Sequence, residues 1–131
     1  MTRCIAAMLA ACAALTAHAQ YPEKPVRVVV STVPGPLDTF ARMLLDKMSA
    51  ALKQPFVVEN KPGAGGNIAA DMVAKSAPDG YTLLFAIDTT FTVNPSIYKT
   101  LPFDPAKDFA VISVPVTYGQ LLAVHSSVPA N

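Results

Sequence analysis

Residues 26–58 read VRVVVSTVPGPLDTFARMLLDKMSAALKQPFVV, and this stretch decides the fold. It opens on a short β-branched run that is typical of a buried strand. Apolar side chains then recur at helical spacing from Leu37 to Leu52, with Pro36 suited to the first turn of a helix and Pro55 beyond its end. A second short apolar run follows at 56–58. The stretch therefore predicts a strand, a helix and a second strand.

The same alternation continues downstream. A glycine-rich loop at 60–66 leads to a shorter predicted helix at 67–76, and the apolar run at 81–87 predicts a third strand. We expect one helical turn at 95–98 and one or two further strands within 111–124. Alternating strands and helices indicate an α/β fold with a parallel sheet and right-handed crossovers. We expect the first strand to lie between the second and the third.

Two polar loops form the candidate site, because ligands of open α/β sheets bind beyond the carboxyl ends of the strands. Residues 31–38 follow the first strand and residues 88–94 follow the third, so both should lie at one edge of the sheet. The first loop also leads into a helix N-terminus, where N–H groups and the helix dipole favour an anion. A threonine-rich turn is an equally good interpretation of the second loop. Hydroxyl groups that can donate to a carboxylate there belong to Ser31, Thr32, Thr89 and Thr90.

Two further features have competing interpretations. Gly63, Gly65 and Gly66 could cradle a phosphate, but their spacing matches neither the P-loop nor the dinucleotide-binding fingerprint. We favour a tight turn that lets Asn67 open the second helix. Asp88 could be catalytic or could bind a ligand amine. General acid–base catalysis normally needs a second titratable group nearby, and the sequence shows none.

The beginning of the chain predicts export. Arg3 precedes an unbroken apolar run at 4–15, and Ala17-His18-Ala19 has the small-residue pattern that a signal peptidase needs. We therefore interpret residues 1–19 as a secretory signal peptide, with a mature domain at 20–131 in the periplasm. The run is too short to anchor the chain across a bilayer. A minor alternative is lipid attachment at Cys12, since residues 9–12 resemble a lipobox.

Composition excludes several function classes for the mature chain. Without Arg3, nine basic side chains stand against nine acidic ones, so no positive surplus favours nucleic acid. Both cysteines, Cys4 and Cys12, lie in the signal peptide, which leaves no disulfide or cysteine-ligated metal. His125 is the remaining histidine, and neither Gly-x-Ser-x-Gly nor His-Glu-x-x-His occurs. We expect no catalytic residue, no metal and no cofactor.

Four segments together resemble a known family. They are VENKPGAGGN at 58–67, APDGY at 77–81, NPSIY at 94–98 and LPFDP at 101–105. In this order the chain resembles the periplasmic solute-binding proteins of tripartite tricarboxylate transporters, the Bug proteins. The resemblance implies a two-lobed, Venus-flytrap α/β fold that captures a small carboxylate and passes it to the permease subunits of a membrane transporter. In some members of the family the partner is a sensor kinase.

The resemblance also suggests where the ligand binds and where this chain departs from the family. The loop after the first strand is one residue shorter than usual, has Gly35 where the family has two adjacent glycines, and carries Pro34 and Pro36, which lack an N–H donor. The family continues through a second lobe, so we expect a truncated chain whose second lobe is missing. A small exported hydrolase-like enzyme and a non-binding remnant are the alternatives. The candidate ligand-binding residues are Ser31, Thr32, Gly35, Asp38, Gly65, Asn67, Asp88, Thr89 and Thr90.

Overall fold

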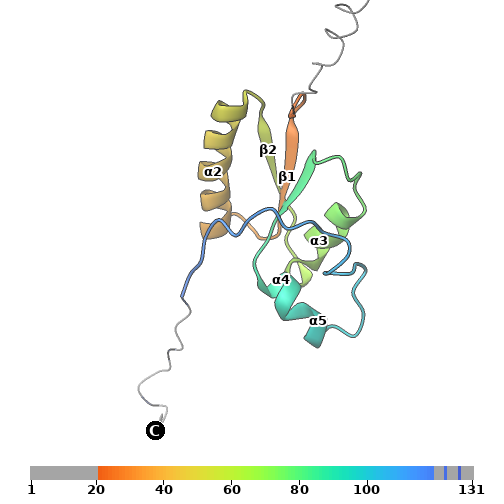
Figure 1. Cartoon of the computed structure of the whole chain (residues 1–131). Helices are drawn as coiled ribbons and strands as arrows, with labels where there is room; N and C mark the ends of the chain where they lie inside the picture. The colour runs from red at the N-terminus through yellow and green to blue at the C-terminus, as the bar shows by residue number, and fades with distance from the viewer. Residues whose placement is uncertain (1–20, 120–122, 124–126, 128–131) are drawn as a thin grey trace, which may run out of the picture.

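A parallel sheet forms the centre of the protein. The computed structural model describes residues 21–119, 123 and 127, and all structural statements concern these residues. Strands β1 (Val26–Val30), β2 (Phe56–Asn60) and β3 (Thr82–Phe85) pair in the order β2-β1-β3. The predicted strand order is therefore confirmed, and β1 is the central strand (Figure 1).

Helix α2 (Pro36–Leu52) covers one face of the sheet, as Figure 1 shows. Its buried residues Ala41 and Leu45 form the core together with the valines that alternate along β1 on that face, Val26, Val28 and Val30. The helix begins with Pro36 as its first residue and is followed by Lys53 in the left-handed conformation, with φ of 54°. These bounds agree with the prediction, because both ends are set by local chain chemistry.

The second crossover is shorter and lies on the other face of the sheet (Figure 1). It consists of a 3₁₀ turn, η2 (Ala64–Gly66), and helix α3 (Asn67–Ala74). After β3 the chain turns through α4 (Thr89–Thr92) and α5 (Asn94–Ile97). The helical turn expected at 95–98 is present as α5, one residue earlier in the chain, whereas α4 was not predicted. Strand β3 is also shorter than the predicted run at 81–87, and α3 ends earlier than predicted.

The strands predicted within 111–124 are wrong over the part that the structure describes. Residues 111–119 have no regular secondary structure, and Val111 and Ile112 are 85% and 79% exposed. β-Branched residues favour the strand conformation, but a strand also needs a neighbouring strand for its backbone hydrogen bonds. No strand in the described part of the chain pairs with this segment.

Several predictions fall outside the described residues. The signal peptide at 1–19, both cysteines and His125 belong to them, so these predictions stay as stated. Within residues 21–119, no helix has the length and apolar character needed to cross a bilayer.

Candidate functional site

Three loops meet where β1 and β3 end. They are residues 31–35 after β1, the glycine loop 63–66 before α3, and residues 86–90 before and within α4. Gly66 brings them together: a Cβ at Gly66 would collide with Thr90 Oγ1 and would lie 3.3 Å from Ser31 Cβ. The two predicted site loops therefore lie at the same edge of the sheet, as expected. The glycine loop, interpreted from the sequence as a tight turn, packs directly against both.

Thr90 and Asn94 hold the glycine loop through its carbonyl group. Thr90 Oγ1 donates to Gly65 O over 3.1 Å, and Asn94 Nδ2 donates to the same oxygen over 2.9 Å. Thr90 is fully buried and Asn94 is 3% exposed. The Thr90 hydroxyl proton is therefore already used within the protein. Sequence reasoning included Asn94 at the end of the candidate loop 88–94 but did not single it out as a site residue; its further signal was its place in the NPSIY segment before Pro95.

Asn67 takes part in the same network. Helix α3 begins at Asn67 as predicted, but no side chain caps it, and its N-cap is Gly66 with φ of 92°. The Asn67 side chain is buried, with an exposed fraction of 6%, and its Oδ1 accepts a 2.7 Å hydrogen bond from Asn94 Nδ2. Asn67 thus links the start of α3 to the start of α5.

Asp38 belongs to a second network, behind the loop that follows β1. Its Oδ2 accepts from Arg42 Nε over 3.0 Å, and its Oδ1 accepts from Asn60 Nδ2 over 2.9 Å. The same Asn60 amide donates to Thr32 O, which ties the end of β2 to this loop. The hydrogen bonds from Arg42 and Asn60 hold the pKa of Asp38 below its usual range. Asp38 is therefore an ionised anchor whose two oxygens already have partners.

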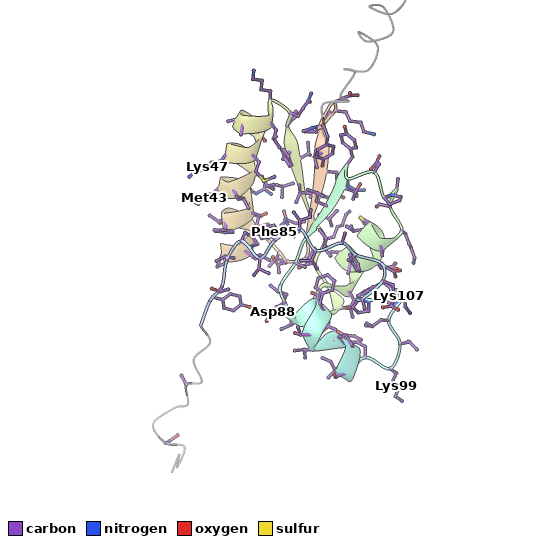
Figure 2. The ribbon with its side chains drawn as sticks, viewed as in Figure 1. Met43, Lys47, Phe85, Asp88, Lys99 and Lys107 are labelled. Atoms are coloured by element: carbon purple, nitrogen blue, oxygen red, sulfur yellow. The ribbon has the colours of Figure 1, made fainter. Side chains whose placement is uncertain are left out.

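Asp88 and Thr89 lie at the open side of the edge. Asp88 is exposed, and Figure 2 shows it between the lower end of α2 and α4. The Tyr118 hydroxyl lies 3.4 Å from Asp88 Oδ1, longer than an ordinary O–H···O hydrogen bond, so this contact is weak. Lys47, on the outer face of α2, points away from Asp88 (Figure 2). Thr89, half-buried, follows Asp88 as the first residue of α4.

The N-terminus of α2 offers donors to this edge. The first backbone bond there runs from Thr39 N to Gly35 O over 2.8 Å, so the N–H groups of Leu37 and Asp38 have no acceptor within the helix. No side chain caps this end. Gly35 has extended backbone, and the nearest atom to a Cβ placed there is Val33 O at 3.8 Å. This end of the helix is therefore uncapped and open.

Two hydroxyl groups at the end of β1 have no partner. Ser31 is 3% exposed, and neither Ser31 Oγ nor Thr32 Oγ1 bonds to any group in the described chain. A buried hydroxyl without a partner costs about 1–3 kcal/mol. A polar group delivered to this edge would offset that cost. The unpartnered hydroxyls and the uncapped helix form a corner next to the glycine loop, and groups of this kind can donate hydrogen bonds to an anion.

A pocket of about 290 Å³ lies on the other side of the glycine loop. It shares Asn67 with the network and is bordered by Asp71, which is paired with Lys75 Nζ at 2.6 Å. Its remaining lining comes from η2, α3 and the segment after α5. Among the described residues, no group of three or more His, Cys, Asp or Glu side chains could hold a metal ion.

The chain is similar to a family of transport receptors. Residues 40–131 match the model of the tripartite tricarboxylate transporter family receptor. A UPF0065 protein of Bordetella bronchiseptica is 42% identical over 119 residues, covering 89% of this chain and 35% of the relative. The chain thus spans about a third of the length of this curated relative.

Solved structures are similar as well. MatC from Rhodopseudomonas palustris with bound malate is 41% identical with a TM-score of 0.64, over 68% of this chain and 31% of that chain. A second R. palustris protein, solved with adipate, is 37% identical with a TM-score of 0.63, over 66% of this chain and 29% of that chain. The periplasmic binding protein BugD is 43% identical with a TM-score of 0.62, over 68% of this chain and 30% of that chain. This likeness confirms the predicted fold class, a parallel-sheet lobe of the periplasmic-binding-protein kind.

Proposed function

Because the chain belongs to the tripartite tricarboxylate transporter receptor family, we propose that it forms the first lobe of a receptor that binds a small carboxylate. One observation carries the proposal. The unpartnered hydroxyls of Ser31 and Thr32 lie at the carboxyl end of the central strand, in the loop that leads to the uncapped N-terminus of α2. Anions bind at such helix ends because backbone N–H groups and the helix dipole both favour negative charge.

The ligand's charge would be met by neutral donors. Arg42 is already paired with Asp38, so its charge is compensated within the protein. Backbone N–H groups of Leu37 and Asp38 and the hydroxyls of Ser31, Thr32 and Thr89 would donate to the carboxylate. The similar structures whose names include malate and adipate support a dicarboxylic acid as the ligand class.

The remaining candidate residues would act around the ligand in different ways. Asp88 is a hydrogen-bond acceptor at the open side of the edge and suits a ligand hydroxyl. Gly35 would leave room for close approach of the ligand, since no side chain fills the space there. Gly65, Asn67 and Thr90 would shape the site through the glycine loop.

A hydrolase would need a nucleophile beside a base. Ser31 is the hydroxyl nearest the end of β1, yet no histidine or carboxylate bonds to it in the described chain. We therefore propose a binding protein without catalytic activity. It would reach the periplasm through the signal peptide at 1–19 and would deliver its ligand to a membrane permease or to a sensor kinase. N-terminal sequencing of the exported protein should find Gln20 first, and a lipid-modified Cys12 would contradict this.

The chain alone should bind malate or adipate only weakly. An exposed helix terminus contributes about 0.3–1 kcal/mol toward an anion, and each neutral hydrogen bond about 0.5–1.5 kcal/mol. A few such contributions reach about 4 kcal/mol, which corresponds to a millimolar dissociation constant. A two-lobed receptor gains further affinity by enclosing the ligand.

Amide NMR titration of the whole chain with malate and with adipate tests this proposal. We expect chemical-shift changes at residues 31–38 and 88–90 with a millimolar midpoint. No change at these residues at tens of millimolar ligand would refute carboxylate binding. Micromolar binding by a monomer would show that a single lobe is a complete receptor.

A further inference from the structure

We propose that Asn94 is a positioning residue that locks the glycine loop in the shape the ligand edge requires. The effect of Asn94 on ligand binding rests on the proposed function. Its effect on the shape of the glycine loop can be tested without a ligand. Asn94 contacts neither the corner formed by Ser31 and Thr32 nor the N-terminus of α2 through any hydrogen bond in the described chain. Its effect on binding must therefore pass through the loop.

One amide group holds the loop at two points. Asn94 Nδ2 donates to Gly65 O over 2.9 Å and to Asn67 Oδ1 over 2.7 Å. These acceptors lie on either side of Gly66, so the single amide spans the bend between η2 and α3. Asn94 is 3% exposed, which shields both bonds from competing water.

The loop needs such support because its backbone is unfavourable by itself. Ala64 has a positive φ of 48°, a conformation that costs a residue with a Cβ atom free energy, and Gly65 follows with φ of 63°. Sparsely populated backbone conformations persist only when surrounding contacts impose them. The contacts here come from α4 and α5, through Thr90 and Asn94.

The glycine loop contacts the proposed ligand site through Gly66, which packs against Ser31. The backbone of Gly66 approaches Ser31 so closely that a Cβ would lie 3.3 Å from Ser31 Cβ. If the carbonyl of Gly65 lost its donors, Gly66 would no longer be held against Ser31. The position of the Ser31 hydroxyl relative to the start of α3 would then no longer be fixed.

Asn94→Asp tests the lock with almost no change in shape. At neutral pH the introduced carboxylate cannot donate to Gly65 O, although Asn67 can turn its amide to donate to the carboxylate. Without ligand, we expect the amide resonances of Gly65, Gly66 and Asn67 to shift or broaden. Malate affinity should fall about tenfold, the effect of losing one well-formed buried hydrogen bond.

The pH dependence of this variant separates positioning from general support. As the pH falls through the carboxyl's pKa, about 4 for an ordinary Asp, the protonated group regains a donor for Gly65 O. The ligand-free resonances of the glycine loop should then return toward their wild-type positions. Asn94→Ala has no such donor at any pH and should show no recovery.

Two controls complete the experiment. Val28→Ala removes two methyl groups from the hydrophobic core and so lowers the stability of the protein. It should leave the resonances of the glycine loop unchanged. Thr92→Ala removes an exposed hydroxyl bond to Asp88 O, outside the network, and should leave the resonances of the glycine loop unchanged. Unaltered loop resonances in Asn94→Asp at neutral pH would overturn the lock, as would equal loop changes in Val28→Ala. If the wild type does not respond to malate, the proposed function fails, and the ligand-free resonances still decide the lock.

Discussion

The two loops that meet at the end of β1 are built in opposite ways. The glycine loop is closed: Gly65 O has two side-chain donors, and no Cβ fits at Gly66. The loop after β1 is open: the hydroxyls of Ser31 and Thr32 have no partner in the described chain, and space remains around Gly35. The difference teaches that one loop satisfies its polar groups within the fold, while the other leaves two hydroxyl groups without a partner in the described chain. Gly66 is therefore required for close packing, whereas Gly35 leaves space that no other group fills.

Gly66→Ala should produce the largest effect. The added methyl group would collide with Thr90 and crowd Ser31, and φ of 92° is unfavourable for alanine. Strain and overpacking together predict a loss of about 2–5 kcal/mol in the free energy of unfolding. Urea denaturation followed by circular dichroism measures the change. A variant as stable as the wild type would show that the glycine loop is not closed.

Thr90→Val should have the next largest effect. It keeps the shape of the side chain but removes a donor from the buried Gly65 carbonyl. We expect a loss of about 1–3 kcal/mol in the free energy of unfolding. Thr90→Ser keeps the hydroxyl and should retain the wild-type amide resonances of the glycine loop, although it loses a methyl group. Equal resonance changes in both variants would contradict the assigned hydrogen bond.

Asp38→Asn should change the acid dependence of stability. Because hydrogen bonds from Arg42 and Asn60 lower the pKa of folded Asp38, its stabilisation is complete above the unfolded pKa, about 4. It is lost as the pH falls through the lowered folded pKa. Thermal melts across this range should show a shallower decline for the variant than for the wild type.

Some acid dependence should remain in that variant. The pKa values of Glu59, Asp79 and Asp104 are also lowered by hydrogen bonds, mainly from Lys61, from the Tyr81 backbone and from Lys107, respectively. Identical pH profiles for variant and wild type would show that Asp38 does not anchor the loop after β1.

Gly35→Ala should have the smallest effect on stability. Its backbone is extended, and a Cβ would approach only Val33 O, at 3.8 Å. We expect the free energy of unfolding to change by less than about 0.5 kcal/mol. Its response to malate in NMR titration should nevertheless weaken, because the methyl group narrows the approach to α2. A loss of stability as large as that of Gly66→Ala would show that the loop after β1 is packed as tightly as the glycine loop.

Much of the fold could be predicted because it follows from local chemistry. Pro36 and Pro55 bracket α2, and the valine run of β1 reads as a buried strand. The prediction failed at 111–119, where β-branched residues have no neighbouring strand to pair with in the described chain. Helix α4 was missed because a polar, threonine-rich segment has no helical pattern of apolar residues.

The sequence predicted where the candidate site lies on the sheet, but it did not predict which hydrogen bonds its residues form. The sequence by itself determined that loops after the first and third strands share one edge, because all strands of a parallel sheet end on the same side. Only the tertiary structure decided that Thr90 faces Gly65 and that Asp38 faces Asn60. These partners lie 25 and 22 residues apart in the chain. Which donor meets which acceptor depends on how α2 and α4 pack on the sheet, and residue type does not encode that geometry.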